Sequence, residues 1–112
     1  MFLGLDLGTT NVKALLTDDD GHVVGRGSAG VRLIHVEDGV EQDIESIWRS
    51  TLDAIREAGD SADLTAVRAI GVSSQAGAMQ IMDADDNPVG KVVSWLDGRG
   101  GGQDAAITSK LG

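Results

Sequence analysis

The first thirty residues alternate short apolar runs with brief polar turns. In the first run Leu3, Leu5 and Leu7 occupy alternating positions, which is typical of a strand with one buried face. Further along, the Asp20-Gly21 pair favours a tight hairpin turn. We therefore predict three strands, over residues 2–7, 11–17 and 22–28. Because their connections are so short, these strands must form an antiparallel meander.

The middle of the chain carries the clearest helix signal. Asp43 is the expected N-cap, and Gly59 is well placed to end the helix. Mostly apolar side chains fall on one stripe between these two residues: Ile44, Ile47, Trp48, Thr51, Leu52 and Ile55. Such a stripe, with charged residues largely opposite, predicts an amphipathic helix.

The remaining segments predict more strands and a weaker second helix. Residues 66–72 form a nearly continuous apolar run, which is typical of a strand covered on both faces. Weaker signals are a strand or extended loop at 31–36, strands at 78–82 and 91–95, a turn at 83–88, a flexible stretch at 98–102 and a helix at 103–111. Strands and helices in this order predict an α/β fold with a mixed sheet, begun by the meander and flanked by helices.

The composition is that of a folded globular chain. Its 112 residues suffice for one domain but not for two domains with a cleft between them. A net charge of −9 disfavours nucleic acid and anionic membranes as partners, and the absence of cysteine excludes disulfides and zinc–thiolate sites. The N-terminus has no basic segment, so we expect no signal peptide and a cytoplasmic protein. Aromatic residues make up only 3% of the chain, and there are 16 glycines. A core so poor in aromatic residues, in a chain so rich in glycine, suggests several tight turns and a missing partner domain.

The sharpest chemical signal lies around the turn between the first two predicted strands. Asp6 stands inside an apolar strand, where burial of an unpaired carboxylate is costly unless a hydrated Mg²⁺ offsets it. Gly8 would let the backbone approach a ligand closely, and the amides of such a turn can bind an anion. Side chains that add donors or positive charge follow: Thr9, Thr10, Asn11 and Lys13. This set suits phosphoryl transfer, and the alternative is a plain hairpin with an exposed aspartate.

Several motifs resemble those of a known family. The segment at 5–13 reads L-D-L-G-T-T-N-V-K and resembles the first phosphate motif of the actin-like ATPase superfamily. Later motifs distinguish its members: G-V-S-S-Q at 71–75, I-M-D-A at 81–84 and V-S-W-L-D-G-R at 93–99. Together they are similar to the N-terminal domain of FGGY carbohydrate kinases, closest to the xylulokinase branch, along the entire chain.

The resemblance implies an RNase H-like fold and a kinase that holds ATP, with Mg²⁺, in the cleft between two such domains. It implies that Asp6 organises Mg²⁺ and that the ATP phosphates are bound by Gly8, Thr9, Thr10, Asn11 and Lys13. The sugar side would be formed by Gln75, Ala76, Gly77, Trp95, Asp97 and Arg99. Trp95 would pack against the substrate, with a core aromatic as the alternative. Asp97 and Arg99 would bind hydroxyls or pair with each other.

The sequence departs from the family pattern in two ways. Where relatives often present Met-His or Arg-Glu to the sugar, this chain has Ala76 and Gly77, which offer no side-chain hydrogen bond. We therefore expect a substrate that is bulkier or is held from elsewhere. A ketose such as xylulose is the leading candidate, and glycerol is a poor one. The family's catalytic base is an aspartate expected downstream of Gly112, so no residue of this chain is assigned that role.

The missing base also sets the expected domain organisation and partners. We expect residues 1–112 to be the N-terminal part of the first kinase domain, without the second, adenosine-binding domain, and to be inactive alone. The expected partners are a sugar or polyol and the remainder of its own kinase chain. A homodimer is a candidate assembly.

Two other functions are compatible with the hairpin. An actin-like or RNase H-like nucleotide-binding module would keep the hairpin without sugar chemistry, but it has no reason to carry the segment at 95–99. A metal-dependent nuclease that uses Asp6 would need further carboxylates at 69–73, where there are none.

The remaining polar segments suggest no site. The acidic turns at 18–20 and 83–87 lack the closing acidic residue of an EF-hand, so we expect solvated turns. His22 and His35 are expected to be surface residues without partners. The glycines at 100–102 are expected to form a mobile tip.

Overall fold

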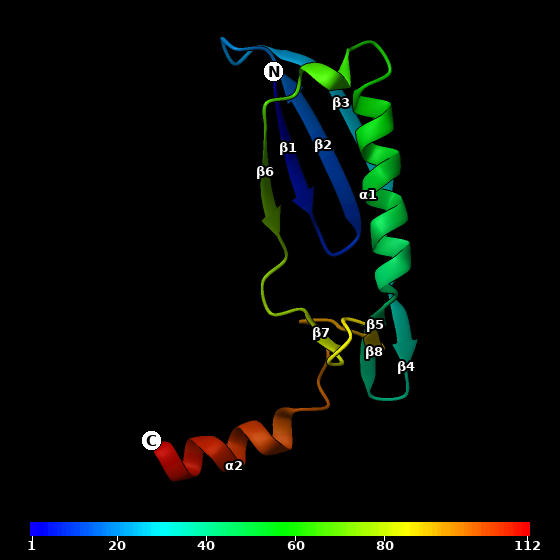
Figure 1. The fold of residues 1–112 in the computed structure, drawn as a ribbon. Coiled ribbons are helices and arrows are strands. Elements are labelled where there is room, and N and C mark those ends of the chain that lie inside the picture. The colour runs from blue at the N-terminus through cyan, green and yellow to red at the C-terminus, as the bar shows by residue number, and fades with distance from the viewer.

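The computed structural model describes residues 1–112, which form two four-stranded sheets and two α-helices (Figure 1). The strands are β1 (Phe2–Leu7), β2 (Asn11–Thr17), β3 (Val23–Gly30), β4 (Ile34–Val36), β5 (Gly39–Gln42), β6 (Ala69–Ser74), β7 (Met79–Met82) and β8 (Pro88–Val93). The helices are α1 (Ile44–Ala58), the single 3₁₀ turn η1 (Leu64–Ala66) and α2 (Gly101–Leu111). The first sheet has the strand order β3-β2-β1-β6, and the second sheet has the order β4-β5-β8-β7.

The first sheet confirms the predicted meander. β1 and β2 are antiparallel with Leu7 opposite Val12, and β2 continues antiparallel to β3. Both of the first two strands have the predicted bounds, while β3 runs two residues further than predicted, to Gly30. β6 then adds parallel to β1, so the sheet is mixed as expected.

Helix α1 packs across β2 and β3 and closes the core on that side of the first sheet. Asp43 is its N-cap as predicted, because its Oδ1 accepts a hydrogen bond of 2.9 Å from the Ser46 amide. Glycine is required where the helix approaches β3: a Cβ on Gly25 or Gly27 would collide with the carbonyl oxygens of α1. The buried core comprises Leu3, Val12, Ala14, Leu16, Val31, Ala54 and Ala58.

The second sheet differs most from the sequence-based expectation. β5 was not predicted, because four residues that begin with a buried glycine and end with a buried glutamine have no apolar alternation. β8 begins at Pro88, three residues earlier than the predicted strand at 91–95, and Pro88 itself was expected to end a turn. The pairing with β7 and β5, rather than local sequence preference, sets these bounds.

The prediction for β6 was wrong in its start and in its burial. Residues 64–66 form the turn η1, capped by the Asp63 side chain, so the strand begins only at Ala69. β6 is an edge strand of the first sheet, and its side chains are exposed in this chain, Val72 to 62%. A run of apolar residues on an open edge indicates a surface without its covering layer.

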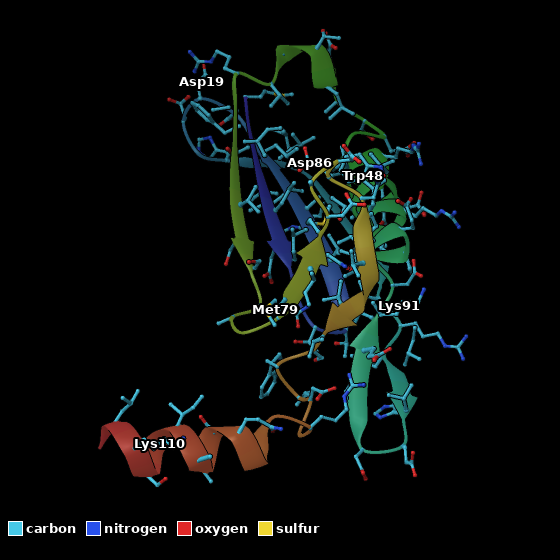
Figure 2. The ribbon with its side chains drawn as sticks, turned by 60° about the horizontal axis from the view of Figure 1, so that its bottom comes forward. Asp19, Trp48, Met79, Asp86, Lys91 and Lys110 are labelled. Atoms are coloured by element: carbon cyan, nitrogen blue, oxygen red, sulfur yellow. The ribbon has the colours of Figure 1, made fainter.

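Helix α2 stands clear of both sheets at the far end of an elongated molecule of 52 × 29 × 27 Å (Figures 1 and 2). It begins at Gly101, so two residues of the predicted mobile tip are helical. All of its residues are exposed, including Leu111 at 82%. Neither α1 nor α2 has the length and apolar character that a membrane-crossing helix requires.

Candidate functional site

Asp6 is exposed, so the expectation that its carboxylate is buried was wrong. The alternation of β1 places Leu3, Leu5 and Leu7 toward α1 and leaves Asp6 on the opposite, open face of the first sheet. No burial cost therefore has to be offset there by a metal ion. Asp6 also forms no ion pair within the chain.

Three polar residues form a row across neighbouring strands of this open face. Asp6 stands opposite Lys13 of β2 and opposite Ser73 of β6 in the strand register. They line a shallow depression of about 500 Å³ together with Gly4 and Gly71. A carboxylate, an ammonium group and a hydroxyl thus share one accessible surface, and neither charged group is neutralised by the other.

The turn that follows β1 is held by its own backbone. The Gly8 amide donates a hydrogen bond of 3.0 Å to the Asn11 carbonyl, and a Cβ on Gly8 would lie 2.7 Å from that oxygen. The glycine is thus required by the turn itself, whereas the sequence had suggested close approach of a ligand. Thr10 and Asn11 are exposed, with an Asn11 Nδ2 to Thr10 Oγ1 distance of 3.2 Å.

Thr9 is the point where the first turn meets the second sheet. Its Oγ1 accepts a hydrogen bond of 2.9 Å from Nε1 of Trp95, which lies just after β8. Its carbonyl oxygen accepts a hydrogen bond of 2.8 Å from Nε2 of Gln42, the last residue of β5. Trp95 is 55% exposed, so the alternative of a core aromatic is wrong for this chain.

The segment after β6 also reaches this junction. The Gln75 amide donates to the Leu7 carbonyl at 3.0 Å, and Gln75 Nε2 donates to Gln42 Oε1 at 2.8 Å. Gly77 has a φ of +77°, and a Cβ there would lie 3.3 Å from the Cβ of Trp95. Ala76 and Gly77 therefore leave an exposed surface beside the Trp95 ring without polar side chains.

Asp97 and Arg99 pair with each other. Arg99 Nε lies 2.9 Å from Asp97 Oδ2, which also accepts a hydrogen bond of 2.9 Å from the Val40 amide. The Arg99 Nη2 group reaches Glu41 Oε1 at 2.8 Å. Hydrogen bonds from the Arg99 side chain, then from its amide, lower the pKa of the Asp97 carboxyl from 3.8 to about 2, and the same carboxylate raises the pKa of Arg99. The pair braces the segment after β8 against β5.

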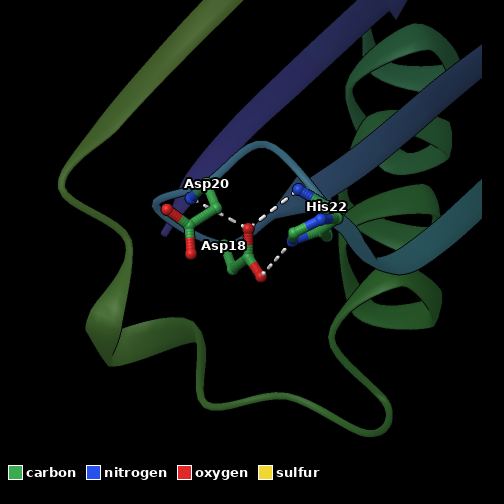
Figure 3. Close-up of side chains that lie close together, drawn as sticks. All are labelled: Asp18, Asp20 and His22. Carbon is green, nitrogen blue, oxygen red and sulfur yellow. Dashed lines mark hydrogen bonds and ion pairs between the residues drawn. The ribbon is translucent and has the colours of Figure 1, made fainter.

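The acidic turns are solvated as expected, but His22 has a partner. Asp18 accepts hydrogen bonds from the amides of Asp20 at 3.0 Å and His22 at 2.8 Å, and its other oxygen lies 3.2 Å from the His22 ring (Figure 3). The His22 amide is the largest cause of a lowered pKa at Asp18. Asp18 thus organises its own turn, and His35 is exposed as predicted.

Gln42 and Glu41 are the residues at this junction that the site prediction did not include. Both belong to β5, which carries no periodic signal, and their role depends on partners 33 and 58 residues away. The one local hint was the position of Gln42 directly before the helix cap Asp43. A glutamine there is ordinarily a surface residue, and its complete burial is a tertiary property.

Comparisons with known proteins show the family of this chain. Residues 1–110 match the model of the N-terminal domain of the FGGY family of carbohydrate kinases. The xylulose kinase of Escherichia coli (strain K12) is 32% identical over 100 residues, which cover 88% of this chain and 21% of the relative. A glycerol kinase of Trichlorobacter lovleyi is 39% identical over 101 residues, which cover 87% of this chain and 20% of the relative.

A solved structure shares the fold. The crystal structure of a xyloylose kinase from Brucella ovis superposes with a TM-score of 0.92 at 28% identity, over 97% of this chain and 24% of that chain. The chain thus spans about a fifth of the length of the curated relatives it matches.

Proposed function

We propose that this chain, which belongs to the FGGY family of carbohydrate kinases, takes part in the ATP-dependent phosphorylation of a sugar or polyol. One observation carries the proposal: the hydrogen bond between Trp95 and Thr9, 86 residues apart, joins the segment that resembles a sugar pocket to the turn that resembles a phosphate motif. Phosphoryl transfer requires an acceptor and a terminal phosphate to be held side by side.

The phosphate side of the proposed site is the open face at the end of β1. Asp6 is accessible and unpaired, as a carboxylate that takes part in Mg²⁺ binding must be. The ATP phosphates would be bound by Gly8, Thr9, Thr10, Asn11 and Lys13, with Lys13 supplying the positive charge. Magnesium, when bound with ATP, neutralises charge on the phosphate oxygens.

The sugar side of the proposed site is the surface around the Trp95 ring, with Gln75, Ala76, Gly77, Asp97 and Arg99 around it. Because Arg99 is exposed and its Nη1 makes no bond within the chain, it keeps a donor for a hydroxyl. Asp97 acts by holding Arg99. The small pair Ala76–Gly77 leaves room for a longer substrate than glycerol, so a ketose such as xylulose is proposed first.

We also propose that the rest of a longer kinase completes this site and supplies its catalytic base. An apolar groove of about 470 Å³ lies open beside α1, lined by Leu5, Leu7, Ile47, Trp48 and Val72 among others. A groove of this kind is ordinarily covered by another element of the same domain. The adenosine-binding domain would come from the same remainder.

The test is substitution of Asp6 in the longer polypeptide that contains this chain. Asp6→Ala should lower sugar-dependent ADP release at least about a hundredfold, because the charge of the transferring phosphate loses its metal carboxylate. Asp60→Ala is the matched control, since Asp60 is equally exposed and unpaired but lies beyond the other end of α1. Equal ADP release by the two variants would contradict the role proposed for Asp6.

Substrate identity is tested with the same assay. A panel of ketoses and polyols is offered with ATP, and the highest kcat/KM is expected for a ketose. A preference for glycerol would overturn the ketose proposal and leave kinase activity standing. A rate of ATP hydrolysis that does not change when any of the sugars or polyols is added would favour the nucleotide-binding module without sugar chemistry.

A further inference from the structure

Gln42 lies completely buried between the two sheets, although it is polar and ends a strand. Its backbone belongs to the second sheet, where it pairs with Val92 of β8. Its side chain crosses to the first sheet, where Nε2 donates to the Thr9 carbonyl oxygen. A buried amide in this position connects two parts of the molecule that share few other bonds.

The direction of the hydrogen bonds is fixed by chemistry. A backbone carbonyl can only accept, so Gln42 must turn its NH₂ group to Thr9 and its Oε1 to Gln75. Gln75 must then offer its own NH₂ group, which leaves the Gln75 Oε1 buried and without a partner. Buried polar atoms without partners are rare in folded proteins.

Thr9 receives one hydrogen bond from Gln42 and one from Trp95. Gln42 holds its carbonyl oxygen and, through its other end, Gln75, while Trp95 holds its hydroxyl. The position of the phosphate turn relative to the Trp95 ring is therefore defined by two hydrogen bonds to one residue. We call the chain of bonds Thr9–Gln42–Gln75 the amide relay.

We propose that Gln42 is a positioning residue, which through the amide relay sets the position of the Thr9 turn against the Gln75 and Trp95 segments. The inference rests on the function proposed above and adds to it a residue that touches neither substrate. A displacement of about 1 Å between reacting groups can cost about a hundredfold in rate, so a rigid link between the two halves of the site has a direct kinetic value.

Gln80 provides a matched control. Gln80 is a partly buried glutamine of the second sheet, and its Oε1, like that of Gln75, has no partner. Its Nε2, however, donates to the carbonyl oxygens of Ile81 and Val89, so all of its bonds stay within the second sheet. The same substitution at Gln42 and at Gln80 therefore distinguishes the effect of losing a glutamine amide from the effect of losing the amide relay.

The first experiment compares Gln42→Met and Gln80→Met in the full-length kinase. Gln42→Met should lower kcat about 10- to 100-fold while the KM for the sugar changes less than about threefold, since the lost interaction acts on alignment in the transition state. Gln80→Met should stay within about twofold in kcat. A Gln42→Met enzyme that melts earlier but keeps its kcat would reduce Gln42 to a structural role and overturn the proposal.

A double-mutant cycle tests whether the effect passes through Thr9. Trp95→Phe removes the indole donor to Thr9 and keeps an aromatic ring. If both residues act through Thr9, the fold-reductions in kcat caused by Trp95→Phe and by Gln42→Met should not multiply in the double variant. The fold-reduction in kcat of the double variant should be smaller, by at least about threefold, than the product of the reductions in the two single variants. Fully multiplicative losses would show that the two residues act independently and would overturn the relay.

A readout without catalysis uses the 112-residue chain itself. In a ¹⁵N-labelled sample, Gln42→Met should shift the resonances of the Trp95 indole N–H and the Gln75 side-chain amide, and Gln80→Met should leave both unchanged. If Gln42→Met does not fold, the double variant Gln42→Met/Gln75→Met is used instead, because it also removes the Gln75 amide that would otherwise lose its partner. An unshifted Trp95 indole in that variant would overturn the relay.

The outcomes separate this inference from the function on which it rests. A full-length protein without sugar kinase activity would overturn the proposed function, whatever the resonances of the chain show. An active kinase in which Gln42→Met and Gln80→Met behave alike would leave the function standing and overturn the relay.

Discussion

The two sheets of this chain are held together by different kinds of interaction. The first sheet with α1 contains the cluster of buried apolar side chains, in which Leu16 and Val12 have no exposed surface, whereas Val92 is the one buried apolar side chain of the second sheet. The buried side chains of the second sheet region include Gln42 and Ser94, and its bonds run through Asp97, Arg99 and the Lys91–Asp43 pair. Apolar packing depends little on pH, whereas ion pairs depend on the protonation of their partners. Hydrogen bonds of side-chain amides depend on the position of each partner.

The largest effect is expected from a cavity in the first sheet. Leu16→Ala should lower the free energy of unfolding by about 2–5 kcal/mol, because a completely buried side chain loses its contacts and leaves a void. Urea denaturation followed by circular dichroism measures it. Leu96→Ala removes the same atoms from a side chain that is 43% exposed after β8, and it should cost clearly less. An equal loss of unfolding free energy in the two variants would contradict the proposed difference between the two regions.

A smaller and local effect is expected in the second sheet at acid pH. The folded chain lowers the pKa of Asp97 from 3.8 to about 2, so the carboxylate stabilises the fold above about pH 4, and this contribution disappears as the pH falls toward about 2. Trp95 fluorescence in a Trp48→Phe background should report the change. Asp97→Asn should remove this pH dependence while keeping an acceptor for the Val40 amide.

The two tryptophans allow the same titration to be read in each region. Trp48 lies on α1 (Figure 2), beside Leu5 and Leu7 of the first sheet. Trp95 follows β8. With Trp95→Phe, the remaining Trp48 signal should change later in the titration than Trp95 does in the converse variant. Coincident transitions would mean that the two sheets unfold as one cooperative unit.

The smallest effect is expected in α2. Leu111→Ala should change the free energy of unfolding of this chain by less than about 0.5 kcal/mol, because the side chain is 82% exposed and α2 packs on neither sheet. Thermal unfolding of the two chains side by side measures the difference. A larger loss would place α2 against the second sheet in solution.

The first region could largely be predicted from the sequence, since local patterns and tertiary structure agree there. The alternation of Leu3, Leu5 and Leu7 specifies both β1 and its buried face, and Asp43 specifies the start of α1. The bounds of the first two strands followed from these patterns and short turns alone.

The second region could not be predicted in the same way, since its elements are defined by distant partners. β5 becomes a strand only through pairing with β4 and β8, and Gln42 becomes buried only through Thr9 and Gln75. In the candidate site, Thr9 bonds directly to Trp95 and reaches Gln75 through Gln42. Asp97 and Arg99 instead pair with each other beside β5. The accessibility of Asp6 was mispredicted because an apolar sequence around a carboxylate does not say which face of the strand is covered.

The alternation of β1 has a consequence for how such a protein can change over generations. Since neighbouring residues of this strand face opposite sides, one inserted residue between Leu3 and Asp6 would turn the leucines that follow toward water and the carboxylate toward the helix. A lineage can replace side chains here one at a time, but it cannot alter the strand's length without losing folding and chemistry together. The exposed pair Asp60 and Ser61 in the turn after α1 carries no such restriction, and insertions are expected to accumulate there instead.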